Sequence, residues 1–190
     1  MVPMTPRKRA SPWATPSSWL VANARSLPRE GRALDLACGS GRHALWLVDR
    51  GLGVRAVDSD PEALRALRAA AEERGLAIET EILDLESGSV DLGQGVYALI
   101  AVFHYLHRPL FPTLVRALAP GGLLLYETFL ESHGGRRPSR PEHLLKSGEL
   151  VWLVSPPLEV LAQREGEFDG RLVASLLARA PAERSGVSRG

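Results

Sequence analysis

A glycine turn between two patterned segments is the first feature of the sequence that could bind a ligand. The stretch Arg32–Gly51, RALDLACGSGRHALWLVDRG, runs from an apolar segment through Gly39, Ser40 and Gly41 into a helical pattern that contains Ala44. A loop of this kind, between a strand and a helix, lets backbone N–H groups approach a bound ligand. The spacing fits two common classes of adenosine cofactor, and the glycines alone do not choose between them.

Three carboxylates lie near the ends of successive apolar segments, and two of them, Asp35 and Asp84, help to make that choice. Asp58 is placed to accept hydrogen bonds from ribose hydroxyls, which both classes of cofactor carry. Asp35 stands just ahead of the glycine loop, where a carboxylate repels a pyrophosphate and attracts the sulfonium and α-amino groups of S-adenosylmethionine. Asp84, in ILDLES, can accept the adenine amino group while the N–H of Leu85 meets a ring nitrogen. The acids therefore favour S-adenosylmethionine over a nicotinamide dinucleotide.

The elements that must position these residues alternate between strands and helices. One helix is expected over residues 42–51, and a second over 60–75 with Asp60 as its N-cap and Gly75 as its stop. Strands are expected over residues 32–37, 53–59, 76–85, 96–103 and 123–129, a turn-rich stretch over 86–95, and further helices over 19–27 and 110–122. Apolar strands separated by helices indicate a parallel sheet covered on both faces.

The end of the chain predicts an antiparallel addition to this sheet. Residues 158–168 and 171–180 are typical of two strands, and Asp169-Gly170 between them favours the positive backbone angles of a tight hairpin. The predicted fold class is therefore α/β. We expect a doubly wound, mostly parallel seven-stranded sheet with a C-terminal antiparallel hairpin strand and helices on both faces.

This ordered series of segments resembles the Rossmann-like, class I S-adenosylmethionine-dependent methyltransferases. The resemblance is carried by LDLACGSGRHALWL, VRAVDSDPEAL, ILDL, YALIAVFHYLHR, LAPGGLLLYETF and the closing hairpin, and covers about Trp19 to Ala180. CGSGRHALWL, HYLHRPL and YETF look most like the small tellurite-resistance-type methyltransferases. The resemblance implies S-adenosylmethionine as cofactor and the following cofactor-binding residues: Asp35, Ala37, Cys38, Gly39, Gly41, Arg42, Asp58, Ser59, Asp84, Leu85 and Phe103.

The candidate catalytic residues lie in VFHYLHRPL, after the fourth strand. Methyl transfer from a sulfonium needs chiefly the alignment of nucleophile, methyl and sulfur, and a base only when the acceptor arrives protonated. His104 and His107 could remove such a proton, and Tyr105 could orient the acceptor. The tetrapeptides NPPY and DPPY, which hold planar amines in nucleic-acid methyltransferases, are replaced by FHYL, which argues against modification of base amines.

A polar loop over residues 131–145 could fold over the site as a lid that selects an anionic substrate, or could be a solvated surface loop. The candidate substrate residues are Arg136 and Arg140 in this loop, with Tyr126 and Glu127 on the preceding strand.

Composition sets the remaining expectations. The chain of 190 residues has 23 Lys and Arg against 22 Asp and Glu, so it has no excess of positive charge that would indicate binding to a nucleic acid. One cysteine, no signal-peptide pattern and no apolar run near the length of a membrane span favour a cytoplasmic protein without a membrane partner. No metal-ligand spacing is present. We expect a flexible segment 1–16, one methyltransferase domain 17–180 and a flexible tail 181–190, as a monomer or homodimer.

Three other functions remain open from the sequence. One is a nicotinamide-dependent oxidoreductase that uses Gly39, Gly41 and Asp58. A second is an RNA or protein methyltransferase that uses the basic loop. A third is a cofactor-binding scaffold without catalysis. The lead hypothesis is methyl transfer to a small molecule, because the chain has little beyond the core fold with which to grip a macromolecule.

Overall fold

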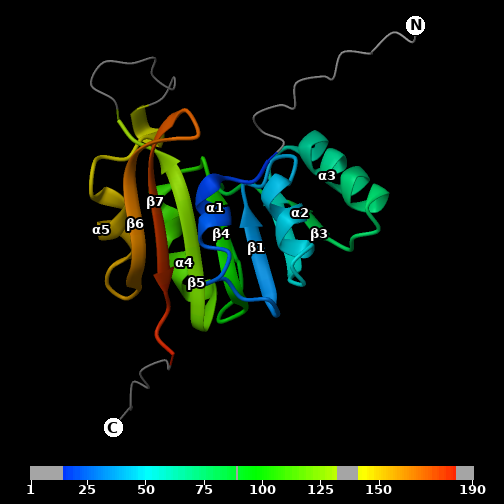
Figure 1. Cartoon of the computed structure of the whole chain (residues 1–190), viewed down its shortest axis with the longest axis horizontal. Coiled ribbons are helices and arrows are strands. Elements are labelled where there is room, and N and C mark those ends of the chain that lie inside the picture. Colours follow the sequence, from blue (N-terminus) through cyan, green and yellow to red (C-terminus); the bar gives the residue numbers. More distant parts are fainter. Residues whose placement is uncertain (1–14, 89, 132–140, 183–190) are drawn as a thin grey trace, which may run out of the picture.

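A seven-stranded sheet forms the centre of the computed structural model, which describes residues 15–88, 90–131 and 141–182 (Figure 1). Its strands are β1 Arg32–Leu36, β2 Gly53–Asp58, β3 Glu79–Ile82, β4 Tyr97–Phe103, β5 Leu118–Phe129, β6 Glu159–Phe168 and β7 Arg171–Arg179. Their order in space is β3-β2-β1-β4-β5-β7-β6. The first five pair in parallel, and β7 runs antiparallel to both of its neighbours. The predicted fold class is confirmed.

Helices cover both faces of this sheet. On one face lie α1 Ser18–Ala22, α2 Arg42–Val48 and α3 Pro61–Glu73, whose apolar side chains pack with one set of strand residues. On the other lie α4 Phe111–Ala117 and α5 Glu149–Val154, packed with the alternate strand residues. Two short 3-10 turns, η1 Arg108–Leu110 and η2 Pro141–His143, complete the set. None of the helices in the described part of the chain is long and apolar enough to cross a membrane.

Local sequence explains the two helices nearest the glycine loop. Asp60 caps α3 by accepting the N–H of Glu62 at 2.8 Å, Pro61 begins the helix, and Leu64 and Leu67 are fully buried against the sheet. Helix α2 begins directly after Gly41, so the glycine loop is the connection from β1 to α2. The carboxyl ends of β1, β2 and β4 meet above this loop, which is where open α/β sheets bind ligands.

The hairpin that closes the sheet is built as its sequence predicts. Asp169 and Gly170 both have positive φ, 51° and 71°, as a tight turn between twisted strands requires. Strand β7 inserts between β5 and β6, so the residues of β5 lie beside those of β7, with Glu127 opposite Ser175. This pairing brings the hairpin next to the carboxyl end of β4.

Several predicted boundaries differ from the structure. The helix expected over residues 110–122 ends at Ala117, because Leu118 is already extended and pairs with Tyr97 while the turn at Gly121 bulges from the strand. The first helix ends at Ala22, and the third strand keeps only Glu79–Ile82. Helix α5 was not predicted. The segments proposed as flexible, 1–16 and 181–190, lie almost wholly outside the described residues and stay a prediction.

Candidate functional site

The loop between β1 and α2 contains three residues with a left-handed backbone conformation. Ala37, Gly39 and Gly41 have φ of 53°, 53° and 77°. The N–H of Cys38 donates to the carbonyl of Val57 at 3.0 Å, which attaches the loop to the end of β2. The loop is therefore fixed by both of the strands that flank it.

The two glycines of this loop serve different purposes. A Cβ on Gly41 would lie 2.2 Å from Leu67 Cδ1, so Gly41 lets α3 pack closely against the loop. A Cβ on Gly39 would meet no atom within 4 Å, so the space beside Gly39 is open. Gly41 is thus required by packing, and Gly39 is the glycine that a ligand can approach.

Asp58 connects this loop to β2. Its Oδ2 accepts the N–H of Gly39 at 2.7 Å, and its Oδ1 accepts the N–H of Asp60 at 2.9 Å. The carboxylate is thereby held at the end of β2 with its charge beside the open space. The prediction that Asp58 stands at the cofactor loop is consistent with this geometry.

A hollow of about 400 Å³ opens beside Asp58. Its lining residues are Ala37, Asp58, Ser59, Leu83, Asp84, Leu85, Glu86 and Tyr105. Asp84 Oδ1 accepts the N–H of Glu86 at 3.0 Å, which fixes the turn after β3. Three carboxylates therefore line this hollow, which we call the acidic hollow. Such a lining is unfavourable for a pyrophosphate.

A second hollow, of about 300 Å³, adjoins the first at Ala37. It is lined by Ala37, Cys38, Gly39, Ser40, Arg42, His43, Phe103 and His104, and we call it the histidine hollow. The ring of His43 stacks on Phe103 with centroids 3.9 Å apart, so Phe103 is held at the end of β4. Of the predicted cofactor-binding residues, all except Asp35 and Gly41 line one of the two hollows.

Asp35 lies in the sheet rather than at the mouth of the loop. It is 1% exposed and lines neither hollow, and its role in cofactor binding stays a prediction. Burial raises the pKa of its carboxyl to about 7, partly offset by a hydrogen bond with the backbone of Ala44 and by the charge of Arg42. Its Oδ2 meets no hydrogen-bond donor of the described chain. The buried Asp35 carboxyl, one oxygen of which lacks a hydrogen-bond donor, therefore lies beneath the loop between β1 and α2.

His104 has an unusual backbone and a crowded ring. Its φ is 59°, and its N–H donates to the carbonyl of Glu127 at 2.7 Å. Nδ1 lies 3.3 Å from Arg42 Nη2 and Nε2 lies 4.0 Å from Glu127 Oε1, while the ring stacks on Phe129. Burial and the charges of Arg42 and Arg171 lower the pKa of His104 to about 4. His104 therefore lines the histidine hollow as a neutral imidazole near pH 7.

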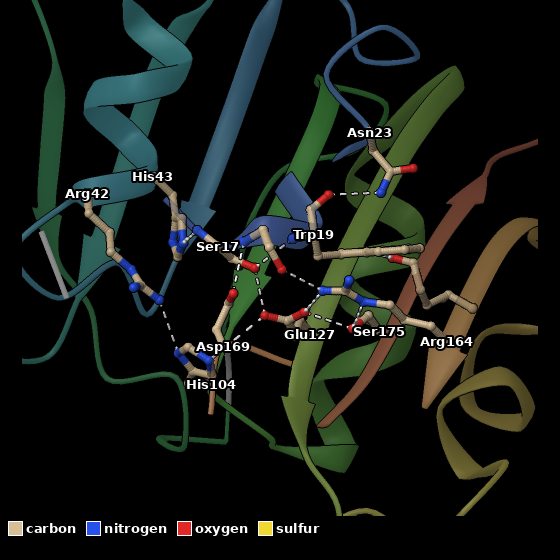
Figure 2. Close-up of polar contacts among 12 residues, drawn as sticks. Ser17, Trp19, Asn23, Arg42, His43, His104, Glu127, Arg164, Asp169 and Ser175 are labelled. Atoms are coloured by element: carbon tan, nitrogen blue, oxygen red, sulfur yellow. Dashed lines mark hydrogen bonds and ion pairs between the residues drawn. The ribbon is translucent and has the colours of Figure 1, made fainter. Parts of the chain in front are cut away.

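Glu127 is the centre of a buried polar network that joins α1 to the hairpin (Figure 2). It is 3% exposed; Oε1 accepts from Ser17 Oγ at 2.7 Å, and Oε2 accepts from Ser175 Oγ at 2.7 Å and Arg164 Nη2 at 3.1 Å. The N–H of Ser17 also donates to His43 Nε2 at 3.3 Å. The start of α1 is thereby held next to the histidine hollow.

The residues of this network were missed by the sequence reasoning, apart from Glu127. A glutamate inside an otherwise apolar strand was the one signal, since a buried carboxylate requires partners. Nothing in the sequence placed Ser17, Arg164 or Ser175 beside it, because they come from segments far apart along the chain.

The remaining candidates are scattered. Tyr105 lines the acidic hollow, with the predicted adenosine contacts, rather than the histidine hollow. Tyr126 is buried in the core at 1% exposure, where its hydroxyl donates to the carbonyl of Tyr105, so the expectation that it reaches the pocket is wrong. His107 precedes η1 and lines neither hollow. Arg136 and Arg140 lie outside the described residues.

Among the described residues, no cluster of His, Cys, Asp or Glu is arranged to bind a metal ion.

Comparison with known proteins agrees with this geometry. Residues 33–122 match the family model described as a methyltransferase domain. An uncharacterised methyltransferase of Mycobacterium tuberculosis is 40% identical over 96 residues, which are 49% of this chain and 37% of that protein. A 2-heptyl-1-hydroxyquinolin-4(1H)-one methyltransferase of Mycobacteroides abscessus is 28% identical over 153 residues, 74% of this chain and 67% of that protein.

The third comparison is with TehB of Haemophilus influenzae. Its sequence, named a probable S-adenosyl-L-methionine-dependent methyltransferase, is 26% identical over 96 residues, 50% of this chain and 34% of that protein. Its crystal structure superposes with a TM-score of 0.70 at 20% identity, covering 85% of this chain and 61% of that one. The sequence matches thus span little more than a third of the length of the M. tuberculosis relative and of TehB. Residues 33–122 are thus similar to a methyltransferase domain, and the fold is shared with TehB.

Proposed function

We propose that this protein transfers a methyl group from S-adenosylmethionine to a small-molecule acceptor. The observation that carries the proposal is the pair of hollows that adjoin at Ala37, one acidic and one lined by His43, Phe103 and His104. A ligand with a nucleoside at one end and an amino acid at the other would extend across both. The cofactor that the family uses has this form.

The residues present fit the two ends of that cofactor. Asp58 would hold the ribose and Ser59 would flank the adenine, while Asp84 and the backbone of Leu85 would meet the adenine edge. Gly39, Cys38 and Phe103 would border the methionine end, with Arg42 at the start of α2. The unsatisfied Oδ2 of Asp35 beneath the loop suits a cation, and the family's cofactor supplies one in its α-amino group.

The chemistry that the bound cofactor would supply is an activated methyl group on a positively charged sulfur. The protein contributes position, because an in-line displacement requires the acceptor atom to be held in line with the breaking bond. The fixed loop, the stacked His43–Phe103 pair and the network at Glu127 provide rigid walls for this purpose.

A small acceptor is supported by the relative from M. abscessus, whose name gives a hydroxyquinolone as its substrate. That alignment covers 74% of this chain. The overall charge of the chain is close to neutral, which does not favour a nucleic-acid acceptor. An RNA acceptor would instead give binding that weakens steeply with added salt.

A nicotinamide dinucleotide is the main competing ligand for the loop. The three carboxylates of the acidic hollow disfavour its pyrophosphate. A scaffold that only binds the cofactor is the other alternative.

The test is an acceptor panel. The purified chain is incubated with S-adenosylmethionine and small phenols, N-hydroxy heterocycles, thiols, amines and inorganic oxyanions, and release of S-adenosylhomocysteine is measured. Turnover of one class above the acceptor-free rate supports the proposal. Tight cofactor binding without turnover of any compound favours the scaffold, and transfer only to RNA or protein contradicts a small acceptor.

A further inference from the structure

The ring of His43 has a hydrogen-bonding state that its neighbours decide. The side chain comes from α2, is 4% exposed and stacks on Phe103. Its Nε2 accepts the backbone N–H of Ser17 at 3.3 Å (Figure 2). A ring nitrogen that accepts a hydrogen bond carries no hydrogen itself, so the hydrogen of the neutral ring is on Nδ1. The contact with Ser17 therefore selects one of the two tautomers.

The surroundings of His43 also keep the ring neutral. Burial lowers the pKa of His43 well below its usual value, and the positive charge of Arg42 lowers it further. A protonated ring would in addition place a hydrogen on Nε2, directly against the N–H of Ser17. Near pH 7 the ring is therefore an uncharged donor through Nδ1.

The Nδ1 atom of His43 is directed to the space that a ligand would occupy. It has no hydrogen-bond partner among the described residues, and it is not one of the fully enclosed atoms that lack one, such as Asp35 Oδ2. The ring lines the histidine hollow, so the remaining accessible part of its polar edge meets that hollow. A nearly buried donor without a partner favours a ligand that offers an acceptor there.

The direction of the Ser17 N–H is fixed by contacts on the other side of the chain. Ser17 Oγ donates to Glu127 Oε1 at 2.7 Å and accepts the N–H of Trp19 at 3.1 Å. The N–H of Ser18 donates to Asp169 Oδ2 at 2.9 Å. The start of α1 is thus attached to β5 and to the hairpin turn, and the N–H of Ser17 is held against His43.

The methionine end of S-adenosylmethionine offers one kind of acceptor for this donor. Its ammonium group only donates hydrogen bonds, its sulfonium does neither, and its carboxylate accepts them. The histidine hollow suits an anion, because Arg42 is the one charged side chain in its described lining. The acidic hollow, by contrast, is lined by three carboxylates. The carboxylate is therefore the group that matches Nδ1 of His43.

We infer that the backbone N–H of Ser17 fixes His43 as an Nδ1–H donor, and that this donor binds the carboxylate of the cofactor. The second half of the inference rests on the proposed function, whereas the state of the ligand-free ring does not. His43 is then a cofactor-binding residue that the sequence did not indicate. Ser17 is a positioning residue that acts through His43, and it joins α1 to the cofactor site.

Calorimetry with two ligands separates binding of the carboxylate from support of the fold. S-adenosylhomocysteine and its decarboxylated analogue are titrated into the unmodified protein and into His43→Phe, whose ring can still stack on Phe103. His43→Phe should weaken binding of S-adenosylhomocysteine about 10- to 100-fold, the equivalent of one hydrogen bond to a charged group. It should change the affinity for the decarboxylated analogue by less than about twofold, the usual limit of additivity.

Nitrogen NMR of the histidine rings reads the tautomer, with His43→Phe used to assign the signal. The ligand-free protein should carry the hydrogen on Nδ1, and S-adenosylhomocysteine, but not its decarboxylated analogue, should shift the resonance of that hydrogen. Ser17→Ala keeps the N–H and should keep the tautomer. Ser17→Pro removes the N–H at a φ of −54° that proline adopts, so the tautomers should become mixed and S-adenosylhomocysteine should bind more weakly than in Ser17→Ala.

A hydrogen on Nε2 of His43 in the ligand-free protein would overturn the inference, as would the same ring state in Ser17→Pro and Ser17→Ala. So would a His43→Phe variant that binds S-adenosylhomocysteine unchanged or loses affinity equally for both ligands. Absence of S-adenosylhomocysteine binding to the unmodified protein would instead refute the proposed function, while the tautomer of the free ring would still test the role of Ser17. The two failures are therefore distinguishable.

Discussion

The Oδ2 atom of Asp58 accepts the backbone N–H of Gly39 at 2.7 Å, which ties the end of β2 to the loop that follows β1. One carboxylate therefore fixes the loop and faces the acidic hollow at the same time. Loss of its charge would affect both the loop and the hollow, so we expect the proposed cofactor binding to depend strongly on Asp58.

Asp58→Ala is expected to weaken S-adenosylhomocysteine binding by about 10- to 100-fold, the equivalent of one or two charge-assisted hydrogen bonds. Calorimetry at fixed pH measures the affinity, and thermal melting checks the fold. The control is Asp60→Asn, which removes the neighbouring carboxylate but keeps a side chain able to cap α3. Equal affinities in the two variants would contradict the role of Asp58.

Gly41→Ala is expected to destabilise the protein by about 2–4 kcal/mol, because it adds left-handed strain to a clash with Leu67. Gly75→Ala is the matched control, since Gly75 also has positive φ, 65°, but a Cβ there meets nothing within 4 Å. Denaturant unfolding gives the free energy of unfolding of each variant, and the difference between the two is the cost of the clash with Leu67. A difference near zero would mean that α3 moves away from the loop at little cost.

The raised pKa of the Asp35 carboxyl predicts that the free energy of unfolding falls as the pH rises. Its carboxyl has a folded-state pKa of about 7 against a reference of 3.8, so between these values the folded protein holds a proton that the unfolded chain has released. The free energy of unfolding should decline by roughly 4 kcal/mol from pH 4 to pH 8, at about 1.4 kcal/mol per pH unit. Urea unfolding at several pH values measures it.

The matched variant is Asp35→Asn, which keeps the shape and removes the ionisation. It is expected to lose most of that decline. Saturating S-adenosylhomocysteine should also reduce the decline in the unmodified protein, since a cation beneath the loop favours the ionised carboxylate. A decline that Asp35→Asn leaves unchanged would assign the titration to another group.

Ser17→Ala should cost about 1–3 kcal/mol, because it leaves Glu127 Oε1 and the N–H of Trp19 without the serine hydroxyl between them. Ser26→Ala, at an exposed position, is the control and should be close to neutral. Proteolysis at the start of α1 should be faster only in Ser17→Ala. The same rate in both variants would argue against a fixed start of α1.

Most of the fold follows from local sequence. The Asp169-Gly170 pair predicts the hairpin because both residues need positive φ, and Asp60-Pro61 predicts the start of α3 because one caps and the other begins a helix. The predicted end of α4 was wrong because of the segment LAPGG, residues 118–122. Pro120 and Gly121 are helix-stop signals, yet they form a bulge in a strand that has already paired at Leu118.

The sequence predicted more of the residues that line the two hollows than of the side-chain contacts around His104. Asp58, Asp84 and Gly39 stand at the ends of strands, and their neighbours follow from the order of the sheet. The contacts of His104 with Arg42 and Glu127 depend on side-chain positions across three elements, which no local pattern encodes. Tyr126 and Glu127 are adjacent, but alternation along β5 directs them to opposite faces.

The central claim is that the two adjoining hollows bind S-adenosylmethionine. Calorimetric titration of the purified protein with S-adenosylhomocysteine, beside a titration with NADH under the same conditions, tests it most directly. We expect saturable one-to-one binding of S-adenosylhomocysteine and no heat of binding with NADH. Binding of NADH without S-adenosylhomocysteine would contradict the account.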